Sequence, residues 1–155
     1  MKLYKERRDI MKSESNIYLR RWYIFDCRWF GLKLHKIMLS DHDCVHDHPW
    51  DFISIILKGG YVEHTEIEKT NNLSAEYLIS KHGYEEYKKL YCKKVSKIYH
   101  PGQILFRRAE HRHKLEIHQP CWTFVITLKR RRKWGFWTKT GWVHWKNFIS
   151  TQVCD

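Results

Sequence analysis

Two histidines, His46 and His48, lie one residue apart in the stretch DHDCVHDHPWDFISIILKGGY at 41–61, just before an apolar run and two glycines. In an extended chain, residues two positions apart point to the same face, so both imidazoles can reach one point. Imidazole nitrogens are common ligands of transition metals in proteins. This spacing predicts that the two side chains bind a metal ion and that a third ligand comes from elsewhere in the chain.

A second histidine-rich stretch, PGQILFRRAEHRHKLEI at 101–117, offers that third ligand. Its pattern predicts two strands joined by a turn at 108–112. In this register His113 shares the parity of the apolar Leu115 and points inward, whereas His111 lies in the turn. Parity therefore favours His113 as the third ligand and leaves His111 as the alternative.

Three imidazoles around one ion suit iron(II), zinc, copper, nickel or manganese. They leave coordination positions open for water, dioxygen or a substrate, which distinguishes a catalytic site from a closed structural one. The sequence alone does not choose among these metals.

The composition indicates one folded domain with an affinity for anions. The chain has 155 residues, of which 43% are hydrophobic and 15% aromatic, too many for a disordered chain. Lys and Arg number 29 against 17 Asp and Glu, giving a net charge of +12. Such a balance favours a small anionic molecule or a nucleic acid as partner.

The five cysteines form no C-x-x-C pair, and the first residues, MKLYKERRDI, have no signal-peptide pattern. We therefore expect a cytoplasmic protein with reduced thiols. No apolar run approaches the ~20 residues of a membrane span, so we expect no membrane partner. A homodimer is left as an open alternative.

Short segments rich in aromatic and β-branched residues, separated by Gly and Pro, predict strands from residue 22 onward. Because no amphipathic helices alternate with them, we expect an all-β fold, an antiparallel sandwich or barrel. The polar segment 68–94 reads as a long loop or hairpin excursion. We divide the chain into a short basic arm or helix at 1–21, a barrel domain at 22–150 and a short tail at 151–155.

The histidine stretch resembles the first motif of the cupin superfamily: two histidines one residue apart, three or four residues, a glutamate, six residues and a glycine. His46, His48 and Gly59 fit this spacing, but Phe52 stands where the glutamate is expected. Asp51 is adjacent and would need a bulge to turn inward, so it is a candidate additional ligand or a support for the ligands.

The second cupin motif, a Pro-Gly turn followed by a histidine, is matched loosely by Pro101, Gly102 and His113. Roughly residues 20–148 also resemble a group of small cupin-like metal-binding proteins of bacteriophages and bacteria. The resemblance implies a single-domain cupin barrel, the double-stranded β-helix or jelly roll, with a metal pocket. Cysteine dioxygenase-like cupins also lack the glutamate and bind iron(II) through three histidines. Iron(II) is therefore the metal we expect, with zinc, manganese and nickel as alternatives.

Four further residues are candidates near this pocket. Arg107 and Arg108 precede the histidine turn, where either one is placed to bind an anionic substrate. Tyr61 and Glu63 follow the glycine turn and are candidate ligands or supports for the ligands. The leading hypothesis is thus an iron(II)- and dioxygen-dependent, dioxygenase-like enzyme acting on a small anionic molecule. The alternative is a non-catalytic pocket that sequesters a small anionic ligand such as a nucleotide.

The segment 129–145 combines five consecutive basic residues with four tryptophans. Cations interleaved with aromatic rings bind phosphates and stack on bases, so nucleic-acid binding through this segment is a second alternative. The competing interpretation is that the tryptophans close the floor of the barrel, with arginines stacked on them or paired with carboxylates. We favour packing.

Overall fold

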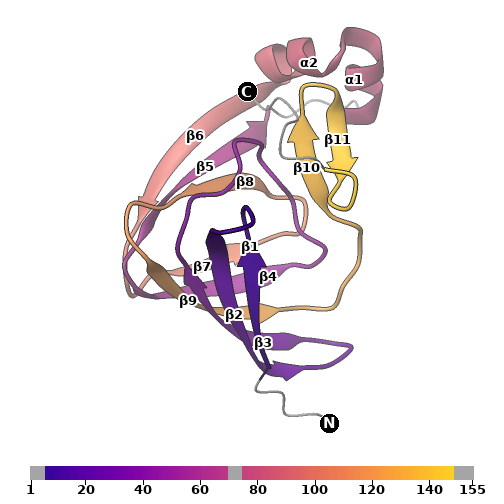
Figure 1. Cartoon of the computed structure of the whole chain (residues 1–155). Coiled ribbons are helices and arrows are strands. Elements are labelled where there is room, and N and C mark those ends of the chain that lie inside the picture. The colour runs from indigo at the N-terminus through magenta and orange to yellow at the C-terminus, as the bar shows by residue number, and fades with distance from the viewer. Residues whose placement is uncertain (1–5, 70–74, 149–155) are drawn as a thin grey trace.

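The computed structural model describes residues 6–69 and 75–148 and consists mainly of antiparallel strands (Figure 1). The predicted all-β fold is confirmed. The strands are β1 (Glu6–Met11), β2 (Ile17–Asp26), β3 (Gly31–Ile37), β4 (Phe52–Lys58), β5 (Tyr61–Glu68), β6 (Cys92–Tyr99), β7 (Ile104–Arg107), β8 (Arg112–Glu116), β9 (Cys121–Thr127), β10 (Gly135–Thr138) and β11 (Gly141–His144), and the helices are α1 (Ala75–His82) and α2 (Tyr84–Tyr91).

Two sheets carry the fold. The larger has six strands in the order β1-β2-β3-β9-β4-β7, and the smaller has three in the order β6-β5-β8. The hairpin β10-β11 lies beyond β8 (Figure 1). Strand β9 shows why these segments form sheets: its residues are alternately buried and half-buried, as expected where one face of a sheet covers a core. That inward face of the large sheet forms one wall of the interior.

A tight turn joins β4 to β5 and sends the chain from one sheet to the other. Gly59 has a φ of 81°, a conformation that favours glycine. A Cβ atom there would stand 2.7 Å from the carbonyl oxygen of Pro120, so the turn also packs too closely for a side chain. Beside it, a small core of Ile56, Tyr61 and Cys121 joins the two sheets at this end.

The expectation of a basic arm or helix at 1–21 is wrong for the part that the structure describes. Residues 6–11 and 17–21 belong to strands β1 and β2, which pair antiparallel at the edge of the large sheet. The strand pattern was hidden because charged side chains on an edge strand face solvent on both sides, so hydrophobic alternation is weak. Residues 1–5 and the predicted tail at 151–155 lie outside the described residues.

The expectation of a loop or hairpin over 68–94 is wrong as well, because helices α1 and α2 occupy much of it. In α2, Tyr84 and Tyr87 are buried on one face, where Tyr84 stacks on Trp137 of β10 with ring centroids 5.6 Å apart. Tertiary packing against the hairpin thus supports a helix that is too short to be stable alone. Neither described helix has the length and apolar character needed to cross a membrane.

The cysteines do not all follow the expectation of reduced thiols. Cys27 and Cys121 are free thiols, whereas Cys44 is disulfide-bonded. The prediction is therefore wrong for Cys44, and it depended on spacing within the sequence, which does not show which cysteines meet in space.

Candidate metal site

The segment that carries His46 is held between β8 and β10 as a short extended stretch. His46 forms antiparallel bridges to His113 of β8 and to Phe136 of β10. The backbone N–H of His46 donates to the carbonyl of His113 at 2.9 Å, and the N–H of His113 donates back at 3.0 Å. On the other side, the N–H of Asp47 donates to the carbonyl of Gly135 at 3.1 Å. These bonds fix the segment on both edges, so His46 and His113 are direct cross-strand neighbours.

Asp47 lies between the two histidines and is fully buried, at 0% exposure. Its Oδ1 accepts the backbone N–H of Gly135 at 2.8 Å, and its Oδ2 accepts the indole N–H of Trp142 at 2.9 Å. Because alternate residues of an extended chain point to opposite faces, anchoring Asp47 on the hairpin directs His46 and His48 to the other face. The pattern His-Asp-His thus combines two ligand candidates with the anchor that orients them.

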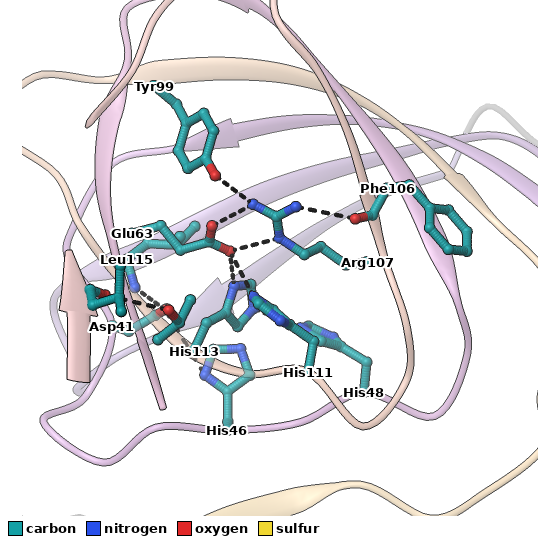
Figure 2. A network of polar contacts seen from close by, with 12 residues as sticks. Asp41, His46, His48, Glu63, Tyr99, Phe106, Arg107, His111, His113 and Leu115 are labelled. Carbon is teal, nitrogen blue, oxygen red and sulfur yellow. Dashed lines mark hydrogen bonds and ion pairs between the residues drawn. The ribbon is translucent and has the colours of Figure 1, made fainter. Parts of the chain in front are cut away.

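The three histidines selected by parity converge inside the fold (Figure 2). One ring nitrogen from each of His46, His48 and His113 lies within 4.8 Å of the others. The Nε2 atoms of His48 and His113 are 2.8 Å apart. The Nδ1 of His46 is buried with no hydrogen-bond partner among the described residues, since Asp41 Oδ2 is 3.8 Å away. Three nitrogens at these separations can share one metal ion.

Glu63 supports this cluster from behind (Figure 2). Its side chain is almost fully buried, and its Oε1 lies 2.6 Å from Nδ1 of His113 and 3.2 Å from Nε2 of His111. Arg107 donates to both carboxylate oxygens, at 3.0 and 2.5 Å, and also to the hydroxyl of Tyr99 at 2.8 Å. A carboxylate that accepts from the Nδ1–H of a histidine leaves Nε2 free to bind a metal, which is the usual support of a histidine ligand.

Glu63, His111 and His113 form a second group of close ligand atoms. Here the carboxylate is already bound on both oxygens by Arg107, whose cation neutralises it. A divalent ion beside the guanidinium group would face a like charge at short range. We therefore assign Glu63 and His111 to the support of the site and not to a second metal.

The charge states suit metal binding. Burial lowers the pKa of His46 to about 4, although Asp41 opposes the shift, and burial together with the neighbouring His113 holds the pKa of His48 well below its ordinary value. Both imidazoles are thus neutral near pH 7, which is the form that coordinates a metal. Burial alone would raise the pKa of Glu63, but hydrogen bonds from His111, His113 and Arg107 outweigh it and hold that pKa far below its usual range.

The remaining predicted site residues do not all reach the cluster. Asp51 accepts the backbone N–H of Ala109 at 2.7 Å and pairs with Arg131 at 2.6 Å. Its predicted role as a ligand or a support for the ligands is therefore wrong, because no bulge turns it inward. Tyr61 lines the cavity beside the histidines and packs on Tyr99, with ring centroids 5.8 Å apart, and burial together with the nearby Glu63 raises the pKa of its hydroxyl.

The two arginines expected to bind an anionic substrate are placed elsewhere. Arg107 is occupied by Glu63 and belongs behind the histidines. Arg108 is exposed on the turn and does not line the cavity. The prediction therefore fails for both, because strand parity does not show whether an inward arginine is already paired.

The histidines open into a cavity of about 440 Å³ between the two sheets, a size typical of small-molecule pockets. Most of its lining is apolar, with Phe52 beside His48 at a ring-centroid distance of 4.7 Å. The sequence analysis did not identify three polar residues of this cavity, Arg21, Lys33 and His35. Lys33 and His35 share the parity of Ile37 on β3, which was a usable signal.

The basic and Trp-rich segment packs against the rest of the domain. Arg132 pairs with the buried Asp47 at 3.1 Å, and Trp134 stacks on Trp145 with ring centroids 5.6 Å apart while lining the cavity. Arg112 lies 3.6 Å from the ring centroid of Trp137. These contacts agree with the packing interpretation, and nucleic-acid binding by this segment stays an untested prediction.

Comparison with known proteins bears on the fold. No family model and no curated protein matches the sequence. An RmlC-like cupin from Shewanella frigidimarina is similar in structure, with a TM-score of 0.52 and 13% identity over 83% of this chain and 86% of that one. The polyketide cyclase RemF from Streptomyces resistomycificus has a TM-score of 0.52 and 12% identity, over 86% and 82% of the two chains.

A third similar structure is iron(II) HppE in complex with its substrate, with a TM-score of 0.53 and 8% identity. The similarity covers 80% of this chain but 56% of HppE, so HppE has substantial parts with no counterpart here. At identities this low, the three structures inform on the fold and leave the chemistry to the residues themselves.

Proposed function

Because the chain has the cupin fold, we propose that it is a metal-dependent enzyme in which His46, His48 and His113 bind one divalent ion. The observation that carries the proposal is the convergence of three ring nitrogens within 4.8 Å at the wall of a cavity. We propose iron(II) as the ion and a small anionic molecule as the substrate, in keeping with the net charge of +12.

The arrangement of protons fits such an ion. If Nδ1–H of His113 donates to Glu63, its Nε2 is an acceptor, and the 2.8 Å contact with His48 then needs a proton on Nε2 of His48. A metal ion placed between the rings would take over the role of that proton and satisfy all three nitrogens. The Nδ1 atom of His46 is also buried without a hydrogen-bond partner among the described residues.

The protein's own residues position the three ligands. Glu63 fixes the ring of His113, and Asp47 fixes the backbone between the other two histidines. Phe52 stands beside His48 where other cupins have a carboxylate ligand, so the ligand set stays neutral. An iron(II) ion held by three neutral imidazoles offers open positions to dioxygen and to a substrate. The neighbour HppE is an iron(II) protein with the same fold, which supports this choice of metal.

Metal content of untagged protein tests the proposal directly. We expect about one divalent ion per chain by mass spectrometry of the purified protein, and at least a tenfold weaker affinity after His48→Ala, because one of three ligands is removed. His64→Ala is the matched control, since His64 is bound to Ser96 and Glu116 on the outer face and contacts none of the three ligands. Circular dichroism would confirm that both variants fold.

The result that contradicts the proposal is equal metal affinity in His48→Ala and His64→Ala. Retention of metal in His113→Ala together with its loss in His111→Ala would instead assign the third ligand to His111. Oxygen uptake with a panel of small carboxylates, measured with iron(II) and with zinc, separates an iron enzyme from a pocket that only binds its ligand.

A further inference from the structure

Two cations face the cavity from the large sheet, on the strands β2 and β3. Arg21 donates from Nε to Nε2 of His35 at 3.0 Å, and Lys33 donates from Nζ to Oγ1 of Thr127 at 3.1 Å. Both partners are neutral acceptors, because burial keeps the pKa of His35 well below its ordinary value. A guanidinium and an ammonium group have more N–H donors than these contacts use, so donors remain for a ligand.

Neither cation has a carboxylate within ion-pair distance among the described residues, although Lys33 is only 3% exposed. The residues that line the cavity include no Asp and no Glu. Burial and the charge of Arg21 lower the pKa of Lys33 to about 8, and Asp26 offsets only part of this effect. Buried charges are normally paired, so two unpaired like charges in one cavity point to a missing anion.

The surroundings restrict what that anion is attached to. The Nζ of Lys33 lies 4.2 Å from the ring centroid of Trp50, a contact between a cation and an aromatic face. Beyond this polar end the lining is mostly apolar, with Leu19, Phe52 and Val125 among its residues. Arg21 and Lys33 line the same cavity as the three histidines, so a group bound by these cations lies in the cavity onto which the histidines open.

We propose that Arg21 and Lys33 bind the carboxylate of a small substrate whose apolar body fills the remaining cavity beside the histidines. This rests on the proposed function, because it takes the metal-binding cavity to be the place where the substrate binds. It replaces Arg107 and Arg108 as the anion-binding residues. A carboxylate bound between the two cations offsets one of their two positive charges and so reduces their repulsion, which gives the site a preference for charge as well as for shape.

Binding of simple probes to the metal-loaded full-length protein tests this inference. Benzoate, phenylacetate and hexanoate serve as carboxylates, benzamide as the neutral analogue of benzoate, and phenyl phosphate as the anion of higher charge, with affinities from calorimetry or ligand-observed NMR. We expect at least one carboxylate to bind, and benzamide to bind at least tenfold more weakly than benzoate. Lys33→Met and Arg21→Met should each weaken carboxylate binding about 10- to 100-fold, the range for a hydrogen bond to a charged group.

The matched control is Lys36→Met, because Lys36 lies on the same strand with its Nζ 5.5 Å from the ring centroid of Trp122 and does not line the cavity. It should leave carboxylate affinity unchanged. Failure of every carboxylate to bind, equal binding of benzoate and benzamide, or equal effects of Lys33→Met and Lys36→Met would overturn the inference. Tighter binding of phenyl phosphate than of any carboxylate would overturn the choice of substrate class.

Metal content measured on the same samples keeps the two proposals apart. Loss of carboxylate binding in Lys33→Met with full metal content supports the anion site. If the wild-type protein binds benzoate but no divalent metal, and Lys33→Met abolishes the benzoate binding, the proposed enzyme function is overturned and the anion site is supported. Full metal content together with unaltered benzoate binding in Lys33→Met and Arg21→Met would overturn the anion site and leave the proposed metal site standing.

Discussion

Buried charge is paired in one wall of the histidine site and unpaired in the other. In the wall behind the histidines, Glu63 of the small sheet and Arg107 of strand β7 form a two-point ion pair, and the remaining bonds of the carboxylate go to His111 and His113. On the wall of the large sheet, Arg21 and Lys33 have neutral partners and repel each other. Buried charges that support the fold are paired within the protein, whereas buried charges that would bind a ligand have no partner of opposite charge.

The difference gives the two walls opposite effects on stability. Removing one member of a buried ion pair leaves the other without a partner, which is strongly destabilising. Removing an unpaired buried charge relieves a desolvation cost and should be stabilising. Mutations can therefore test this comparison, because it predicts both the sign and the size of each change in the free energy of unfolding.

The largest effect should come from Glu63→Gln. The substitution keeps the volume but leaves Arg107 charged and buried beside a neutral amide. We expect the free energy of unfolding of the metal-free protein, measured in urea, to fall by about 3–5 kcal/mol. Glu116→Gln, which alters an exposed pair with His64, should leave the midpoint nearly unchanged. A small loss from Glu63→Gln would show that the two walls do not differ as described.

The next effect, of opposite sign, should come from Lys33→Met. Burial and the charge of Arg21 lower the pKa of Lys33 from 10.5 to about 8, which corresponds to a cost of about 3 kcal/mol for the charged form. The variant keeps the apolar stem, so without an anion present we expect the free energy of unfolding at pH 7 to rise by about 1–3 kcal/mol. Lys36→Met is the control, and destabilisation by Lys33→Met would show that its charge is compensated.

The same residue predicts a pH dependence. Below pH 8, Lys33 is protonated in both states and the folded protein has the full burial cost. As the pH rises from about 8 to 10.5, the folded protein loses the proton first while the unfolded chain keeps it, so stability rises in this window. The stability difference between wild type and Lys33→Met should therefore shrink over this range in urea unfolding. A difference that stays constant would contradict the assignment.

The smallest effect should come from Arg131→Gln on the surface. Arg131 contacts Asp51 and Glu110, each at 2.6 Å, but water screens this exposed cation. We expect no measurable shift of the urea midpoint and no change in metal content. A loss of metal would show that Asp51 supports the metal site, because Arg131 is the side chain that pairs with its carboxylate.

The histidine cluster was within reach of sequence reasoning because it depends on local geometry. The two-residue spacing of His46 and His48 fixes a common face, and the apolar neighbours of His113 fix its direction. The structure brings these three residues together, while their binding of a metal stays a prediction. The all-β fold followed from strand-like segments in the same way, and it is confirmed.

The rest depended on contacts between distant segments. Helix α2 packs on Trp137, which lies some fifty positions later, and a sequence pattern of tyrosines does not show that partner. Arg107 and Arg21 are both arginines on strands, yet one is neutralised by Glu63 and the other is open. Only the packing of the two sheets against each other reveals which cation has a carboxylate beside it.

The anchoring of Asp47 has a consequence for the life of the nascent chain. Its carboxylate is held by Gly135 and by Trp142, 88 and 95 positions further along. A ribosome thus releases both histidines well before it has made the groups that hold them in register. Stable metal uptake should then follow docking of the hairpin β10-β11, so bound metal would indicate that this hairpin has been made and has docked.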